Sequence, residues 1–195
     1  MTARKKSSKD TTRTPEKSLS GEFTNFPTVV HGRSQVTYRC QMVQMQLAVI
    51  ETLLSLDGRT ETLQLSPSDL PVEVEGTLSF EVGLANGVFF DHLDRQTAND
   101  LMQHIYSSKD QRILDFIIVV GYWYSRGKKT QALKTDHYQL RFLFSQRSFE
   151  ALLYHSRGIR RLHLDELFTT VFNELKRTLA REQLGTIKIE LLETL

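Results

Sequence analysis

Hydrophobic positions along this chain change their spacing several times, and each spacing predicts a different element. Apolar residues recur at helical intervals over residues 42–54, and again after Asp94, which is the expected N-cap of a second helix ending near Tyr106. The first of these helices should end at Asp57-Gly58. A third helix, closed at Gly185, is predicted by one apolar stripe: Leu164, Leu167, Phe168, Val171, Phe172, Leu175 and Leu179.

Alternating or β-rich stretches predict strands between these helices. The expected strands cover residues 35–39, 72–80, 82–90, 114–124, 138–144, 149–155 and 187–191, with a break near Glu81-Val82-Gly83. Several strands follow one another without an intervening helix, which favours antiparallel pairing over a doubly wound parallel sheet. We therefore predict an α+β fold, a mainly antiparallel sheet with about three helices packed on it.

Length and composition are consistent with one soluble domain. The chain has 195 residues, and we expect a disordered basic tail over residues 1–22 followed by a single domain over residues 23–195. The tail has no apolar segment typical of a secretion signal. The longest apolar run, 116–124, is too short to span a bilayer, so we expect a cytoplasmic protein with no membrane partner.

Motifs that carry enzyme chemistry are missing from the sequence. It contains no glycine-rich phosphate loop, no G-x-S-x-G turn and no pair of histidines at i, i+4 spacing. The single cysteine, Cys40, is expected to be a buried residue that acts as a small hydrophobe. Metal-dependent nucleases carry an acid-x-Lys triplet on a strand, but the triplet of this chain, at 174–176, falls on the predicted third helix. We therefore expect a non-enzymatic protein with no cofactor, no metal site and no catalytic residue.

Charge is the most informative property of the sequence. The net charge of +2 combines a block of −8 over residues 51–100 with a block of +7 over residues 126–161. The acidic block could contact the basic block of another copy, bind a separate basic protein, or neutralise the basic block within the monomer.

Basic residues follow two of the predicted strands. If residues 114–155 form an up-down-up meander, the ends of its first and third strands emerge at the same edge of the sheet. That edge would gather basic side chains next to two aromatic ones, a combination suited to single-stranded nucleic acids or other polyanions. The candidate residues are Arg126, Lys128, Lys129, Arg157, Arg160 and Arg161, with Trp123 and Tyr124.

Two functions remain open from the sequence. The leading hypothesis is a binding or assembly module that acts through contacts with another protein or with a second copy of itself. The alternative is a module that binds RNA, single-stranded DNA or another polyanion through the basic edge of residues 126–161.

Overall fold

The structure, a computed structural model, describes residues 18–65, 74–108, 111–127 and 129–195. Three helices lie in this part of the chain: α1 (Met42–Leu56), α2 (Arg95–Ser107) and α3 (Leu164–Arg181). The strands described are β1 (Ser18–Glu22), β2 (Gly32–Tyr38), β3 (Thr60–Leu65), β4 (Val74–Ala85), β5 (Phe89–His92), β6 (Ile113–Arg126), β7 (Lys129–Phe144), β8 (Ser148–Arg157) and β9 (Ile187–Thr194).

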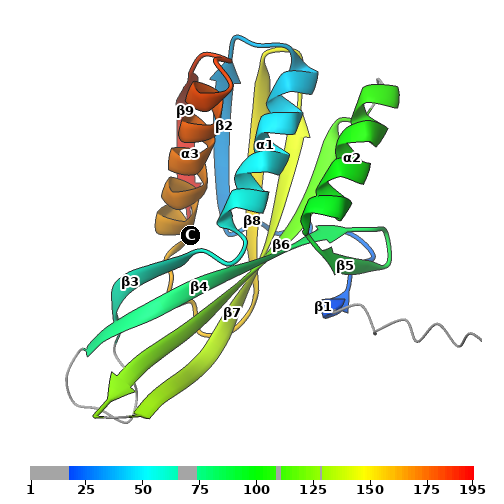
Figure 1. Cartoon of the computed structure of the whole chain (residues 1–195). Coiled ribbons are helices and arrows are strands. Elements are labelled where there is room, and N and C mark those ends of the chain that lie inside the picture. The colour runs from blue at the N-terminus through cyan, green and yellow to red at the C-terminus, as the bar shows by residue number, and fades with distance from the viewer. Residues whose placement is uncertain (1–17, 66–73, 109–110, 128) are drawn as a thin grey trace, which may run out of the picture.

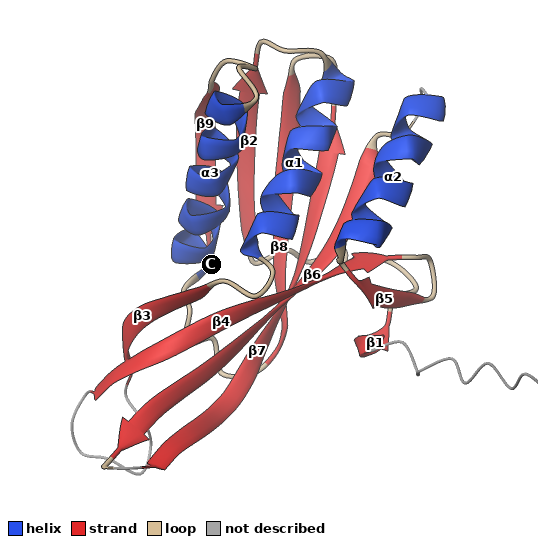
Figure 2. Ribbon diagram, in the orientation of Figure 1, coloured by secondary structure: helices blue, strands red, loops and turns tan. Residues whose placement is uncertain are grey.

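All of these strands belong to one antiparallel sheet. Its order is β1-β5-β4-β6-β7-β8-β2-β9, and β3 pairs with β4 beside that path. The three helices lie side by side over one face of the sheet (Figures 1 and 2). The predicted α+β fold with a mainly antiparallel sheet is therefore confirmed.

The ends of the described chain differ in how they meet the sheet. Of the basic tail predicted over residues 1–22, residues 1–17 lie outside the described part, and Ser18–Glu22 pair with β5 as β1. β9 is the last strand on the opposite side and pairs only with β2 among the described strands. No described helix combines the length and apolar character needed to cross a membrane.

The helices begin and end close to where the sequence predicts. The carboxylate of Asp94 caps α2 by accepting a hydrogen bond from the Thr97 backbone N–H at 2.8 Å. The first helix ends at Leu56, and Gly58 then adopts a positive φ of 74°. The third helix ends at Arg181, four residues before the predicted stop at Gly185.

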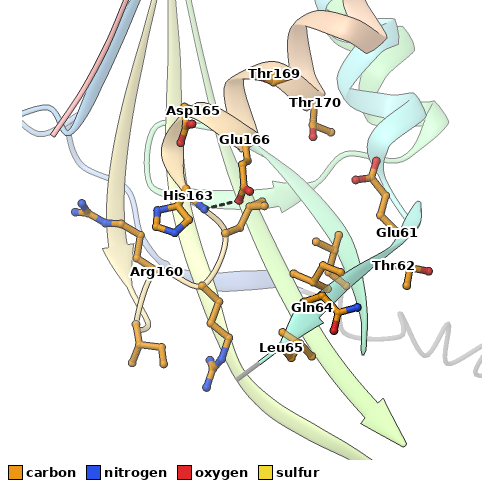
Figure 3. Close-up of a pocket in the computed structure, with 15 residues that line it drawn as sticks. Glu61, Thr62, Gln64, Leu65, Arg160, His163, Asp165, Glu166, Thr169 and Thr170 are labelled. Atoms are coloured by element: carbon orange, nitrogen blue, oxygen red, sulfur yellow. Dashed lines mark hydrogen bonds between the residues drawn. The ribbon is translucent and has the colours of Figure 1, made fainter. Parts of the chain in front are cut away.

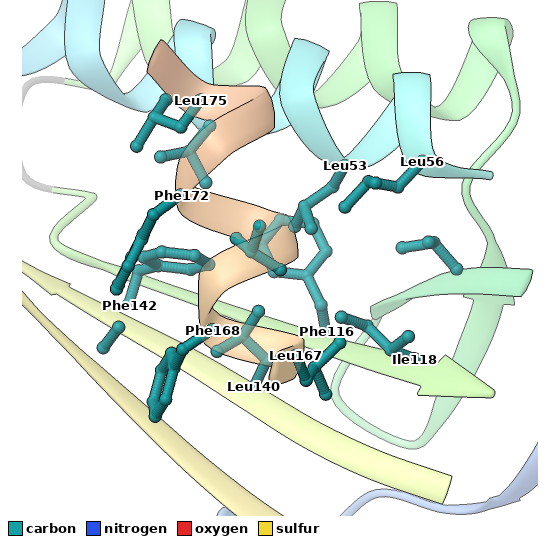
Figure 4. Close-up of a cluster of buried hydrophobic side chains, with 14 of the residues drawn as sticks. Leu53, Leu56, Phe116, Ile118, Leu140, Phe142, Leu167, Phe168, Phe172 and Leu175 are labelled. Atoms are coloured by element: carbon teal, nitrogen blue, oxygen red, sulfur yellow. The ribbon is translucent and has the colours of Figure 1, made fainter. Parts of the chain in front are cut away.

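The core lies between the helix layer and the sheet. Side chains of α1 and α3 pack on aromatic and branched residues of β6 and β7, among them Leu53, Leu56, Leu167, Phe168, Phe172 and Leu175 against Phe116, Ile118, Leu140 and Phe142 (Figure 4). A smaller cluster of Phe23, Phe26, Phe90, Ile117 and Val119 is separate from this core. Residues such as Ile117 and Val119 alternate with Phe116 and Ile118 along β6, so this cluster lies on the sheet face away from the helices.

Two predicted strand boundaries are wrong. β4 continues through Glu81-Val82-Gly83 because pairing with β6 holds these residues, and Gly83 also pairs with His92 of β5. The chain reverses instead at Asn86-Gly87, where Gly87 has a φ of 97°. The strand predicted to start at residue 138 starts at Lys129, since β6 supplies a partner for the polar residues that precede it.

These long strands form an arm that continues beyond the helices. We call the arm β3 together with residues 74–79, 121–126 and 129–136 of β4, β6 and β7 (Figure 1). β8 does not extend along it, because the last residue of β8, Arg157, pairs with His137. The arm decides where the predicted basic residues lie.

Candidate functional site

The predicted basic residues fall into two separate groups. Arg126 pairs with Lys129 at the tip of the arm, whereas Arg157 pairs with His137 at its base. His137 lies eight residue steps from Lys129 along β7, a distance of roughly 26 Å at about 3.3 Å per step. Lys128 lies outside the described residues. The two groups therefore leave the sheet in the same direction, as the meander predicts, but at different distances along it.

Two of the three arginines of the second group, Arg160 and Arg161, are held by the protein itself. The Arg160 guanidinium donates to the backbone oxygen of Leu195 at 2.7 Å. That of Arg161 donates to the oxygen of Lys134 at 2.9 Å and lies over the ring of Tyr122, 5.5 Å from its centre. Arg157 is exposed.

The two predicted aromatic residues do not form a shared stacking surface. Tyr124 is buried in the main core and its hydroxyl donates to Gln131. The indole of Trp123 is half-buried and lies over Gly121, where a Cβ atom would be 2.5 Å from it. Neighbouring residues of a strand point to opposite faces, so these two rings cannot stack on the same ligand face.

A buried carboxylate, which sequence reasoning missed, organises the loop between β8 and α3. Asp136 is fully buried, and its Oδ1 accepts from the Arg160 backbone N–H at 2.8 Å. Its Oδ2 accepts from the Arg161 N–H and from the Tyr122 hydroxyl, both at 2.7 Å. Burial alone would raise the pKa of Asp136, but these hydrogen bonds lower it below its ordinary value. The carboxylate is therefore ionised and anchors the loop.

Two tyrosine hydroxyls fix the next residue of the same loop. The Leu162 N–H donates to the hydroxyl of Tyr122 at 3.0 Å, and the hydroxyl of Tyr138 donates to the Leu162 oxygen at 2.6 Å. Burial raises the pKa of both hydroxyls, so they remain protonated donors. Gly158, with a φ of 107°, lies so close to Asp136 that no side chain fits there. We call this set of contacts to residues 158–162 the loop anchor.

Two histidines connect the loop anchor to the start of β2. The His155 Nε2 lies 3.4 Å from Asp136 Oδ1, and the His155 backbone N–H donates to His31 Nδ1 at 3.0 Å. The ring of His31 stacks on Tyr154 with centres 4.7 Å apart. Burial, together with the nearby charges of Arg160 and His155, lowers the pKa of His31. His31 is therefore a neutral acceptor at neutral pH.

A histidine beside a carboxylate resembles part of a catalytic triad, but among the described residues His155 lacks the nucleophile; the Thr135 hydroxyl lies 3.1 Å from the Nε2 of His137 instead. Within the described residues, no serine, threonine or cysteine side chain is hydrogen-bonded to His155, the histidine next to the buried carboxylate. Burial raises the pKa of the Cys40 thiol, which disfavours the reactive thiolate. The part of the chain that the structure covers also holds no group of three His, Cys, Asp or Glu side chains arranged to bind a metal ion.

A large groove of the described surface lies between the arm and α3. It has a volume of about 760 Å³ and places Thr62 and Gln64 of β3 across from the loop and the first turn of α3 (Figure 3). Two of its three acidic residues have partners: Glu61 pairs with Arg59 at 2.8 Å, and Glu166 accepts from the His163 N–H at 3.1 Å, whereas Asp165 is exposed. The lining is polar and carries both signs of charge, so it selects no single class of ligand.

Among the described residues, the acidic block and the basic block of the sequence form no ion pair with each other. Glu51 pairs with Arg95 at 3.1 Å, and Arg59 bridges Glu61 and Glu174. No ion pair between described residues joins the block 51–100 to the block 126–161. The described residues of the two blocks therefore do not neutralise each other through ion pairs.

The outer edge of β9 exposes apolar side chains next to each other on one strand. Ile189 and Leu192 are 37% and 40% exposed on this strand, and Leu195 beyond it is 86% exposed. An open hollow of about 660 Å³ lies beside residues 30–33 and 192–195. We call β9 with Leu195 the β9 edge. It combines apolar side chains with a backbone that has no strand partner on its outer side among the described residues.

The loop anchor holds one end of the β9 edge. The Leu195 N–H donates to the His31 oxygen at 2.8 Å, while its own oxygen accepts from Arg160. His31 and Arg160 are themselves fixed by His155 and Asp136. These contacts restrain the Leu195 end of the edge, and such restraint lowers the conformational entropy lost when a partner binds.

Comparisons with protein-family models, with curated proteins and with solved structures gave no match for this chain.

Proposed function

We propose that this protein is a non-enzymatic binding module that accepts a partner strand at the β9 edge. The observation that carries the proposal is the combination of exposed Ile189 and Leu192 with a strand backbone that is open on its outer side. Strand addition uses main-chain hydrogen bonds for affinity and alternate side chains for specificity.

The direction of the backbone groups supports this mode of binding. The Leu195 N–H bonds to His31 and the Leu191 oxygen accepts from Ser34, so alternate residues from 191 to 195 face β2. Leu192 and Thr194 lie between them, and their N–H and C=O groups therefore face outward. A partner strand would find regularly spaced donors and acceptors there.

The test is selection of short peptides from a displayed library of random ten-residue sequences. Peptides retained by the wild-type protein should lose at least tenfold in affinity for Leu192→Pro, which removes an outward N–H from an edge position where proline is tolerated. The matched control, Leu192→Thr, keeps that N–H and should retain most of the binding. Circular dichroism and thermal melting would check that both variants are folded.

One result would overturn the proposal. If no selected peptide distinguishes the folded Leu192→Pro variant from the wild type, the β9 edge does not take a partner strand. Peptides that bind both proteins equally would place the binding surface elsewhere on the molecule.

Polyanion binding is the alternative function, and it now depends on fewer free side chains. Arg157 and Lys129 are exposed, but Arg160 and Arg161 are engaged by main-chain oxygens. Neutralising about four phosphates predicts a log–log salt slope of about −3 to −4 in a titration with single-stranded RNA or DNA. No binding at about 50 mM salt would refute this alternative.

A further inference from the structure

The two faces of β9 can be assigned from its pairing with β2. Ile189 and Leu192 lie opposite Val36 and Ser34, which are both buried on the helix side of β2. Lys188 and Glu193 lie opposite Thr37 and Arg33, on the other side.

A β-bulge makes this assignment possible. Ile189 and Leu192 are three residues apart, so a regular strand would place them on opposite faces. The register shifts between Gln35 and Val36 of β2, which leaves Glu190 as an extra residue of β9. Because of this shift, the apolar pair shares one face and the oppositely charged pair shares the other.

We propose that the partner strand is β9 of a second copy of this chain, paired antiparallel about a two-fold axis between residues 190 and 191. This inference rests on the proposed function of the β9 edge. A two-fold axis perpendicular to the sheet keeps each side chain on its own face, so only residues of the same face can lie opposite each other.

With the axis between residues 190 and 191, every exposed residue lies opposite a residue of the same face. It places Ile189 opposite Leu192 of the second copy, and Lys188 opposite Glu193, each pair occurring twice. Side chains directly opposite in an antiparallel pair have Cβ atoms about 5 Å apart, so the apolar pairs touch and the charged pairs attract. Moving the axis by half a residue, onto residue 190 or residue 191, would shift the partner by one position and set residues of opposite faces against each other.

The expected assembly is a weak dimer. Stable dimers bury about 1,600 Å² in total, and one added strand pair supplies only part of such an interface. In the monomer Lys188 is bound to Glu190 at 2.9 Å, and this ion pair competes with the intermolecular one. We therefore expect a dissociation constant of about 10 to 100 μM, within reach of analytical ultracentrifugation.

Charge reversal at the paired positions tests the register. Lys188→Glu and Glu193→Lys each set like charges opposite each other twice per dimer, and each should weaken dimerisation roughly tenfold or more. The double variant K188E/E193K restores opposite charges and should dimerise like the wild type. Lys176→Glu, an exposed charge reversal on α3, is the matched control and should leave dimerisation unchanged.

A mixture of the two single variants provides the sharpest result. Neither forms the dimer alone, but a heterodimer of K188E with E193K has opposite charges at both sites. Equal amounts of the two variants should therefore sediment as a dimer under conditions where each alone is monomeric.

Two results would overturn the inference. One is a wild-type protein that stays monomeric up to about 500 μM, well above the expected dissociation constant. The other is a wild-type dimer that the single reversals leave intact or that the mixture does not rebuild. In either case the proposed strand-binding function fails only if the selected peptides also bind the Leu192→Pro variant as well as they bind the wild type. Failure of the dimer and failure of strand binding are therefore distinguishable.

Discussion

Replacing Asp136 by asparagine tests the loop anchor, because it changes the acceptor on which four donors converge. Oδ1 faces the Arg160 N–H and His155, whereas Oδ2 faces the Arg161 N–H and the Tyr122 hydroxyl. An asparagine side chain has only one oxygen. In either orientation its NH₂ group therefore faces one buried backbone N–H, which loses its acceptor.

The size of the effect follows from these contacts. A buried donor left without an acceptor costs about 1–3 kcal/mol, and hydrogen bonds to a charged group are stronger than those to a neutral one. We expect Asp136→Asn to lower the free energy of unfolding by about 2–4 kcal/mol. With an m-value of about 2 kcal/mol/M in urea, the midpoint should fall by about 1–2 M.

The assay is urea unfolding, followed by far-UV circular dichroism and by the fluorescence of Trp123, the single tryptophan. Asp100→Asn is the matched control, since this exposed carboxylate accepts only from the Gln96 side chain, and its loss should stay within about 0.5 kcal/mol. The cost of Asp136→Asn should be the same at pH 5 and pH 7. Because folding lowers the pKa of Asp136, its carboxylate contributes fully to the free energy of unfolding at pH values above its ordinary pKa of 3.8. This contribution is lost only as the pH falls through the lower pKa of the folded protein. A cost below about 0.5 kcal/mol for Asp136→Asn would refute the anchoring role.

Three further predictions concern other parts of the same structure. Gly158→Ala should destabilise the protein by more than about 3 kcal/mol in urea unfolding, because a methyl group there overlaps Asp136. The control Gly87→Ala, at a positive φ with open space around it, should cost about 1 kcal/mol. Equal costs for the two variants would contradict the close approach of Gly158 to Asp136. The free energy of unfolding should fall as the pH drops from 7.5 to 5.5, because the lowered pKa of His31 lets the unfolded state bind a proton first. His31→Asn, which retains a hydrogen-bond acceptor that does not titrate, should reduce the slope of the free energy of unfolding against pH. An unchanged slope would show that His31 is not its source. Gly121→Ala should displace the indole of Trp123 and shift its emission to longer wavelength with little loss of stability; unchanged emission would show that the indole lies elsewhere.

The sequence predicted the helices well because each has a long apolar stripe with a recognisable end. The α3 stripe lies in the core, and Asp94 caps α2 as its spacing predicts. Strand limits were harder to predict where the residues are polar. Residues 129–137 contain Lys, Thr and Gln with little alternation, and they form a strand because β6 offers them a backbone to pair with.

The missed first half of β7 explains why the predicted basic edge is divided. The sequence correctly indicates that the loops after β6 and β8 leave the sheet in the same direction, but it carries no information on how far each strand extends. Asp136 could be counted only as one acid within a basic block. Its role depends on contacts with Tyr122 and with the backbone of residues 160 and 161, which lie 14 to 25 positions away.

The loop anchor has a consequence for how this protein could change over evolutionary time. Arg160 connects Asp136 in the interior to Leu195 at the surface, through its backbone N–H and its guanidinium. A substitution of the buried Asp136 would therefore act on the position of Leu195 without a direct contact between the two residues. If the β9 edge binds a partner strand as proposed, substitutions at residues that the partner does not contact would change the strength of that binding. The buried carboxylate of Asp136 would then act on the proposed binding surface through Arg160.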